Sequence, residues 1–447
     1  MGKVALITIV GPTDSDTSID KSGYENTATV SFLRNNNKSD VSINAFLKEL
    51  KKLKLEPSEI AMDLLVIACS MYGADTRISR NDYAEDSWTR IIDLYIPVSD
   101  LELWNSQKVL IEKIFRFLTG DIWKIIFRER ADKNLLLSPK GNLKKYGMPY
   151  KTDTVCLFSG GMDSFIGAID LLDKGITPLL LSHSKSADVS SYQVKCEKAL
   201  VSEFPGIGIK RVDAYISIPK QKLLGEVENT ERGRSFLFLS LGAICASTLG
   251  ITSKLIVPEN GLISLNIPLT PLRIGAHSTR TTHPHYFNLM KELFDGLGLG
   301  VTIMNPFQFK TKGEMLIDST RKNLVVKTES MSCSHPSGRW HGLGNIHCGY
   351  CVPCIIRQAS FLKAGLTDSN KYRIDIGAQK QLKISEAEGA DFLAFQYMIE
   401  KNKRNANYLI ASIRNTGPLG INVDSFVDVY NRGLKEVQEL VKNIKLV

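Results

Sequence analysis

From Thr154 onward, short apolar runs alternate with stretches in which apolar residues recur at helical spacing. The apolar runs predict strands at Val155–Phe158, Thr177–Leu181, Ile209–Ile216, Lys254–Val257 and Val301–Met304. The periodic stretches predict helices at Ser164–Leu172, Ser191–Glu203, Ser235–Thr248, Pro284–Phe294 and Thr311–Asn323. This alternation predicts an α/β fold with a doubly wound parallel sheet, in which ligands lie at the carboxyl ends of the strands.

The regions on either side of this alternation have a different pattern. Residues 1–150 are expected to form an N-terminal α+β accessory domain, with strands at Val4–Val10 and Ala28–Phe32 and helical spacing throughout Ser106–Arg130. The end of this region is rich in lysine, glycine and proline, which predicts a linker. The alternating domain would then cover 151–365, and two periodic stretches predict a helical C-terminal region over 366–447.

Composition and charge narrow the class of protein. The chain has 447 residues, of which 43% are hydrophobic and 23% charged, as in ordinary globular proteins. Its net charge of +9 weakly favours anionic partners such as nucleotides, and nucleic acid is compatible but not required. The eight cysteines do not form a secreted disulfide pattern, so a reducing, cytoplasmic location is expected. Ser235–Ser253 carries no charge, but its many small residues predict a buried helix and not a membrane span.

A glycine-rich turn follows the first strand of the alternating region. It reads Ser159-Gly160-Gly161-Met162-Asp163-Ser164 and leads directly into a predicted helix. Glycines let a phosphate approach the backbone, and the N–H groups that begin the helix favour an anion. Asp163 could hold Mg2+ or orient the loop. An ordinary strand-to-helix turn is the alternative, but the position between strand and helix favours nucleotide binding.

Four of the cysteines are clustered near the end of the alternating region. Cys333, Cys348, Cys351 and Cys354 include two overlapping CxxC pairs, a spacing that suits a closed tetrahedral Zn2+ site with four thiolate ligands. An iron–sulfur cluster is also compatible with four thiolates.

The two motifs occur in this order in a known family. The turn resembles the pyrophosphate loop of ATP pyrophosphatases, and residues 152–365 resemble the QueC-type 7-cyano-7-deazaguanine synthases. Further matches are Gly233-Arg234-Ser235, Thr311-Lys312-Gly313-Glu314 and the CGxCxxCxxR segment ending at Arg357. Because of its flanking regions, the chain resembles an extended branch found in bacterial anti-phage defence operons, the QatC component of the Qat system.

The resemblance implies an adenine nucleotide alpha hydrolase-like fold and a set of ligands and roles. ATP and Mg2+ would bind at the loop, with Asp163, Lys312 and Arg234 as catalytic residues and Zn2+ on the four cysteines. The enzyme would be a carbon–nitrogen ligase that adenylates the carboxylate of a 7-carboxy-7-deazaguanine-type substrate. The product would be an amide or nitrile, or a conjugate with an amine of a protein partner.

The sequence departs from the family in the segment that should bind the acceptor. After the fourth predicted strand, polar residues are concentrated between Glu259 and His283, and the expected substrate-binding residues are Glu259, Asn260, Arg273, Arg280 and His283. A polar surface loop is the ordinary alternative. Two other functions also remain open, namely a tRNA-modifying sulfur transferase with the same type of loop, and a non-catalytic nucleotide-binding subunit of a defence complex.

Overall fold

The N-terminal region is built on a four-stranded sheet in which every pair of neighbours runs parallel. In this computed structural model, the sheet order is β2-β1-β3-β4. The structure describes residues 2–33, 39–84, 86, 88–132, 150–183, 187–216, 218, 224–228, 230, 232–269, 280–334, 346–383 and 387–447. The elements of this region are β1 (Lys3–Val10), β2 (Asn26–Phe32), α1 (Asn44–Lys52), α2 (Glu59–Arg77), α3 (Arg80–Tyr83), β3 (Ile91–Val98), α4 (Leu101–Thr119) and β4 (Ile122–Glu129), with a 3-10 turn at Lys21–Gly23.

Two expectations for this region were wrong. The parallel strands make it an α/β unit and not the α+β domain that the sequence suggested, because pairing direction leaves no mark in the periodicity of one strand. The helical pattern over Ser106–Arg130 belongs to a helix and a strand. Helix α4 ends at Gly120, which has a left-handed φ of 77°, and β4 begins two residues later.

The middle region forms a second parallel sheet of five strands in the order β7-β6-β5-β8-β9. The first strand in sequence lies at the centre and the chain winds outward in both directions, which confirms the predicted doubly wound α/β sheet. The strands are β5 (Thr154–Leu157), β6 (Leu179–His183), β7 (Lys210–Ala214), β8 (Ser253–Ile256) and β9 (Val301–Met304). The helices are α5 (Met162–Asp173), α6 (Ala187–Glu203), α7 (Arg234–Ser247), α8 (Gly261–Ser264), α9 (Pro284–Gly296), α10 (Lys312–Asp318), α11 (Lys322–Lys327) and α12 (Val352–Ala364).

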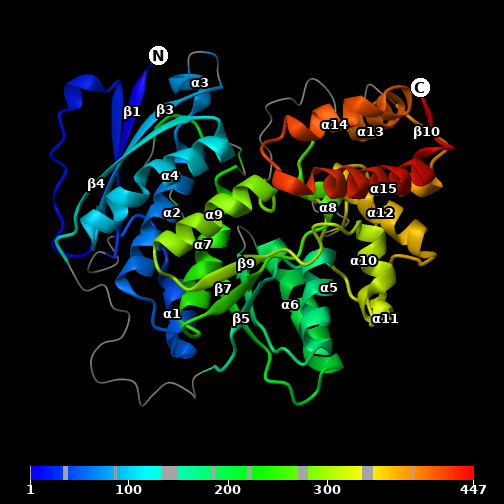
Figure 1. The fold of residues 1–447 in the computed structure, drawn as a ribbon, viewed down its shortest axis with the longest axis horizontal. Helices are drawn as coiled ribbons and strands as arrows, with labels where there is room; N and C mark the ends of the chain where they lie inside the picture. The colour runs from blue at the N-terminus through cyan, green and yellow to red at the C-terminus, as the bar shows by residue number, and fades with distance from the viewer. Residues whose placement is uncertain are drawn as a thin grey trace.

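The C-terminal region is mainly helical, with α13 (Ala387–Arg404), α14 (Ala406–Arg414) and α15 (Val423–Val441). Short 3-10 turns lie at Ile376–Ala378 and Gly420–Asn422, and β10 (Gln381–Leu382) pairs in parallel with β11 (Lys445–Leu446). Helix α15 packs against α12 and contacts α8 and α10. In Figure 1 these helices, in orange and red, lie on the opposite side of the five-stranded sheet from the blue N-terminal strands.

The two sheets share one layer of helices. Helices α2 and α4 cover the N-terminal sheet, and helices α7 and α9 cover the middle sheet. The two coverings meet because α2 packs against α7 and α4 packs against α9. A single apolar cluster runs through this layer, from Val4 and Leu94 of the first sheet to Phe236 and Leu255 of the second. The largely buried α7 confirms that the uncharged stretch after Arg234 is a core helix. Among the helices that the structure describes, none combines the length and the hydrophobicity that a membrane crossing requires.

Candidate active site and metal centre

The glycine-rich turn lies where the topology predicts a ligand site. It joins the central strand β5 to α5, and the chain winds in opposite directions on the two sides of the boundary between β5 and β8. The first residue after Gly161 is the start of α5, and Gly161 supplies no side-chain cap. The N–H groups of the first helical turn therefore lack a capping side chain, as an anion-binding helix end requires.

The backbone of the turn is held in a conformation that requires glycine. Gly160 has a φ of 79°, and a Cβ atom there would lie 2.9 Å from the backbone nitrogen of Gln193. Its carbonyl accepts a hydrogen bond of 2.8 Å from Met331 N. The Ser164 hydroxyl donates to Gly161 O at 3.0 Å and lies 3.2 Å from the Ser159 hydroxyl. Met162 is fully buried, and its side chain belongs to an apolar core cluster.

Asp163 connects three segments that are distant in sequence. Its Oδ1 lies 2.6 Å from Lys312 Nζ, and its Oδ2 accepts hydrogen bonds from Asn260 N at 3.1 Å and Asn260 Nδ2 at 2.7 Å. Both Asp163 and Lys312 are at most 9% exposed, so the ammonium is held close to the turn by a poorly solvated carboxylate. The Asn260 amide also caps α8, because its Oδ1 accepts from Ile263 N. Asn260 thus orients Asp163, and both polar ends of its side chain are already used.

The C-terminal region fixes the helix that carries Lys312. Thr311 forms a capping box with Glu314 at the start of α10. Glu436 of α15 accepts a hydrogen bond of 2.5 Å from the Thr311 hydroxyl and one of 3.2 Å from Gly313 N. Arg432 of α15 donates to Glu314 at 2.7 Å. The position of Lys312 therefore depends on a helix more than a hundred residues further along the chain.

Glu259 lies beside this group at the end of β8. Burial raises the pKa of Glu259 to about 7, with a smaller contribution from the charge of Asp163. The Thr282 hydroxyl donates a hydrogen bond to its carboxylate, and Asn305 Nδ2 donates to its backbone carbonyl at 2.9 Å. A carboxyl group with this pKa can exchange a proton near neutral pH.

The other expected site residues occupy different surroundings. Arg234 begins α7, and its Nε donates to His183 Nδ1 at 3.5 Å at the carboxyl end of β6. His283 is fully buried, with Nε2 2.9 Å from the Thr416 hydroxyl and Nδ1 accepting from His285 N. Burial lowers the pKa of His283 to about 3, so it is neutral at pH 7 and packs between the N- and C-terminal regions. Arg280 contacts α4, and Arg273 lies outside the described residues.

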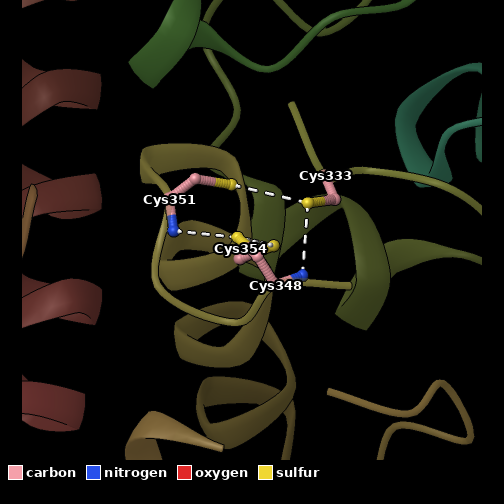
Figure 2. A group of neighbouring side chains, drawn as sticks. All are labelled: Cys333, Cys348, Cys351 and Cys354. Atoms are coloured by element: carbon pink, nitrogen blue, oxygen red, sulfur yellow. Dashed lines mark hydrogen bonds between the residues drawn. The ribbon is translucent and has the colours of Figure 1, made fainter. Parts of the chain in front are cut away.

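The four cysteines come together as predicted (Figure 2). Their sulfur atoms all lie within 4.8 Å of one another, and the Cys333–Cys351 and Cys348–Cys354 pairs are each 3.9 Å apart. A single tetrahedral ion with metal–sulfur bonds near 2.3 Å requires sulfur–sulfur separations of about 3.8 Å. Backbone N–H groups donate to two of the sulfurs, from Cys348 to Cys333 and from Cys351 to Cys348. These thiols can therefore hold a metal ion such as zinc.

Hydrogen bonds connect the segment before the cysteine cluster to the glycine-rich turn. Met331, which donates to Gly160 O, lies two residues before Cys333. Buried Arg357 on α12 donates to the Ser330 hydroxyl at 2.8 Å and the Ser332 hydroxyl at 3.1 Å, and forms an ion pair of 2.6 Å with Asp368. The segment that joins the cysteines to the turn is thus held by hydrogen bonds to Gly160 and to Arg357. A metal ion on the cysteines would therefore stabilise the turn without contacting a ligand bound there.

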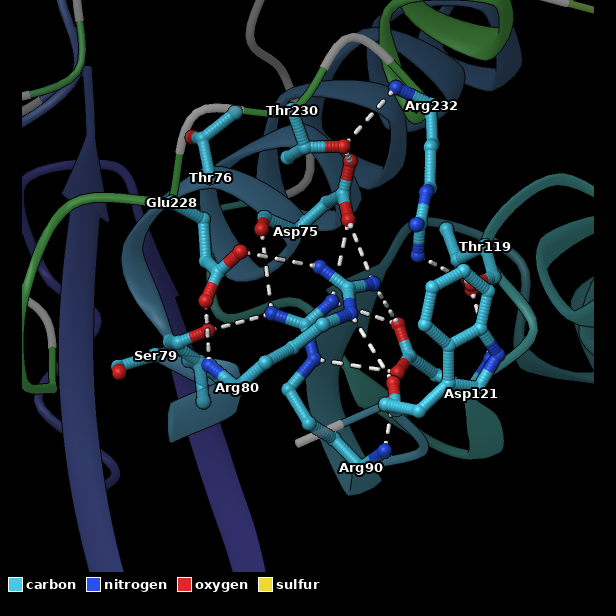
Figure 3. Close-up of polar contacts among 12 residues, drawn as sticks. Asp75, Thr76, Ser79, Arg80, Arg90, Thr119, Asp121, Glu228, Thr230 and Arg232 are labelled. Atoms are coloured by element: carbon cyan, nitrogen blue, oxygen red, sulfur yellow. Dashed lines mark hydrogen bonds and ion pairs between the residues drawn. The ribbon is translucent and has the colours of Figure 1, made fainter. Parts of the chain in front are cut away.

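A buried cluster of charged residues connects the N-terminal region to the start of α7, beside the five-stranded sheet (Figure 3). Asp75 of α2 accepts a hydrogen bond of 2.8 Å from Gly233 N, next to Arg234. Asp75 also forms ion pairs with Arg90 at 3.0 Å and Arg80 at 3.4 Å, and Asp121 forms ion pairs with the same two arginines. Neither Asp75 nor Glu436 was identified from the sequence, because each acts on a motif more than 120 residues away and has no motif of its own.

The known proteins whose sequences are similar to this chain share one name. No family model matches the chain. A 7-cyano-7-deazaguanine synthase from Syntrophobacter fumaroxidans is 26% identical over 244 residues, which are 51% of this chain and 98% of that protein. The enzymes of that name from Geotalea uraniireducens and Solidesulfovibrio magneticus are 28% and 27% identical, over 50% and 49% of this chain and 98% and 95% of their own lengths. Half of this chain is therefore similar to nearly complete 7-cyano-7-deazaguanine synthases.

Proposed function

We propose that the chain is an ATP-dependent carbon–nitrogen ligase that adenylates a carboxylate. The substrate would be 7-carboxy-7-deazaguanine or a close relative, and the fold would be of the adenine nucleotide alpha hydrolase type. The observation that carries this proposal is the meeting of Asp163, Lys312 and Asn260 beside the uncapped start of α5. The similarity to 7-cyano-7-deazaguanine synthases supports the choice of substrate.

Each residue of the site has a role in this chemistry. The backbone N–H groups at the start of α5 would bind the phosphates of ATP, and Lys312 would stabilise the negative charge that develops as pyrophosphate leaves. A carboxylate oxygen of the substrate attacks the α-phosphorus, which gives an acyl adenylate and pyrophosphate. Attack by an amine then releases AMP and forms an amide. Glu259, with its raised pKa, could accept the proton that the amine loses.

The four cysteines fit the Zn2+ that the proposal implies, whereas the carboxylate offered to Mg2+ at the turn is Asp163, whose two oxygens also contact Lys312 and Asn260. Mg2+ would be held by the phosphates and Asp163, and it would neutralise charge on the leaving pyrophosphate. Zn2+ would be held by the four cysteines and would act through the structure alone, because a closed four-thiolate site leaves no open position for a substrate. The other four cysteines are buried, so a sulfur-transfer reaction would have no exposed thiol outside the cluster.

The acceptor and the biological role form a further part of the proposal. Ammonia would give an amide and, after a second activation, a nitrile, whereas an amine of a protein partner would give a conjugate. The N- and C-terminal regions both contact the segment 259–283 at His283. These contacts support an acceptor whose binding requires the flanking regions as well as the part shared with the 7-cyano-7-deazaguanine synthases. If the acceptors are proteins encoded beside this one in a defence operon, the chain would act in anti-phage defence. Co-expression with those neighbours and intact mass measurement would detect the conjugate, and plating efficiency of phages would measure protection.

The activity is tested by separating the nucleotides formed from ATP with and without 7-carboxy-7-deazaguanine. We expect AMP and pyrophosphate to form only with the substrate, and Lys312→Met to lower the rate by about 100-fold or more. Lys310→Met is the matched control, because Lys310 lies two residues away and forms a half-exposed ion pair with Asp318. Formation of ADP, or equal rates for Lys312→Met and Lys310→Met, would contradict the proposal.

A further inference from the structure

Two arginines from the middle region reach the same end of the N-terminal helix α4. Arg232 lies just before α7 and donates from Nη1 to Thr119 O at 3.2 Å. Arg280 lies just before α9 and donates from Nη1 to Phe117 O at 2.7 Å. The last carbonyl groups of a helix have no partner within the helix and attract cations, so these contacts fix the two side chains in place.

Aromatic rings support both guanidinium groups from one face. The Arg232 guanidinium lies 4.5 Å from the centre of the Trp88 ring, and the Arg280 guanidinium lies 4.4 Å from the centre of the Phe117 ring. A guanidinium has five N–H donors in one plane, and stacking leaves the edges of that plane accessible to acceptors. In each arginine, the contact with α4 uses only part of this set.

The positive charge of this pair is only partly offset, because Asp75 and Asp121 of the adjacent cluster act on Arg232 and not on Arg280. In the adjacent cluster of Figure 3, Arg80 and Arg90 form ion pairs with Asp75, Asp121 and Glu228. Within the part of the chain that the structure describes, neither Arg232 nor Arg280 has an ion pair with a carboxylate. Burial and, to a smaller degree, the charge of Arg232 together lower the pKa of Arg280 to about 10. Two partly buried cations that repel each other favour the binding of an anion.

The two arginines also lie next in sequence to residues that the candidate active site uses or contacts. Arg232 immediately precedes Gly233 and Arg234, which Asp75 and His183 hold. The Ser235 hydroxyl lies 2.8 Å from the Thr281 hydroxyl, so the start of α7 is connected to the residue that follows Arg280. An anion held by both arginines would therefore sit beside the acceptor segment.

We propose that Arg232 and Arg280 form an oxyanion-binding site that takes a carboxylate or phosphate group of a substrate. This site deepens the proposed function, on which its assignment to a substrate rests. The N-terminal region then has a direct part in recognition, since α4 and Trp88 hold both arginines in position.

Trp88 provides a direct reporter for binding of inorganic phosphate. Tryptophan fluorescence is recorded during a phosphate titration at constant ionic strength, without ATP. A saturable change is expected in the wild type, and Arg280→Gln should weaken it by about tenfold or more, because a charge-assisted hydrogen bond is lost. Trp88→Phe should lose the signal but retain binding in calorimetry. Arg116→Gln, which removes an exposed charge from the same helix, should titrate as the wild type does.

Further arms identify the source of the anion. The titration is repeated with 7-carboxy-7-deazaguanine, which offers a carboxylate, and with AMP, which offers a phosphate; the ligand whose affinity falls in Arg280→Gln is the one that the site takes. If Arg280→Gln does not fold, Arg280→Lys keeps the charge and should still weaken binding, since the planar set of donors is lost. A response without saturation, or identical titrations for the wild type and the folded Arg280 variant, overturns the site. Because no step requires ATP, this result is independent of whether AMP is formed in the activity assay.

Discussion

The protonation of Glu259 gives the most quantitative prediction. A change in pKa from its usual 4.5 to about 7 corresponds to about 3 kcal/mol of free energy. The folded protein holds this proton more tightly than the unfolded chain, so the associated stability is present below pH 4.5 and is lost as the pH rises through about 7. Glu259→Gln removes the titrating group and keeps the shape of the side chain. Relative to this variant, the wild type should therefore lose most of that amount between pH 5 and pH 8.

The assay is urea unfolding of both proteins at a series of pH values. The difference between their free energies of unfolding isolates Glu259, because every other titrating group is common to both. Glu56→Gln is the control, since Glu56 is an exposed carboxyl and its removal should leave the difference from wild type nearly independent of pH. If the wild type and Glu259→Gln change in parallel across this range, the raised pKa and the proton-accepting role built on it are both wrong.

Three further substitutions test how the site is held. Gly160→Ala should lower the melting temperature more than Gly175→Ala, because both positions have a positive φ but only at Gly160 would the new Cβ approach a backbone nitrogen of α6; equal shifts would contradict the close contact. Cys351→Ser should lose bound metal in elemental analysis, whereas Cys69→Ser, in the buried part of α2, should retain it; unchanged metal content in Cys351→Ser would exclude this cluster as the site. Asp75→Asn should destabilise the fold by about 3–5 kcal/mol in chemical denaturation, because two buried arginines lose a counter-charge, and an effect below 1 kcal/mol would show that the cluster does not join the two regions.

Local patterns predicted the middle of the molecule well. The apolar run at Val155–Phe158 became the central strand, and the cysteine spacing placed four thiols in one tetrahedral group. Both features are determined by residues close together in sequence. The turn at Gly160 is similar, because the sharp bend and the absence of a side chain are properties of the glycines themselves.

Features that depend on distant contacts were not predictable. The strand within Ser106–Arg130 has the same apolar content as the helix before it, and only the helix end at Gly120 and pairing with β3 separate them. The acceptor segment looked like one polar set, but Arg280 and His283 face the N- and C-terminal regions, and Asn260 orients Asp163. Periodicity cannot indicate which element a polar side chain will meet.

Transfer of oxygen from the substrate to AMP tests the central claim most directly. If a carboxylate attacks the α-phosphorus of ATP, one of its oxygens stays on the phosphate when the amine displaces AMP. With 7-carboxy-7-deazaguanine labelled with heavy oxygen in the carboxylate, the wild type should produce AMP that carries one heavy oxygen, and Lys312→Met should produce very little. Unlabelled AMP, or ADP in its place, would show that this chain does not activate a carboxylate by adenylation.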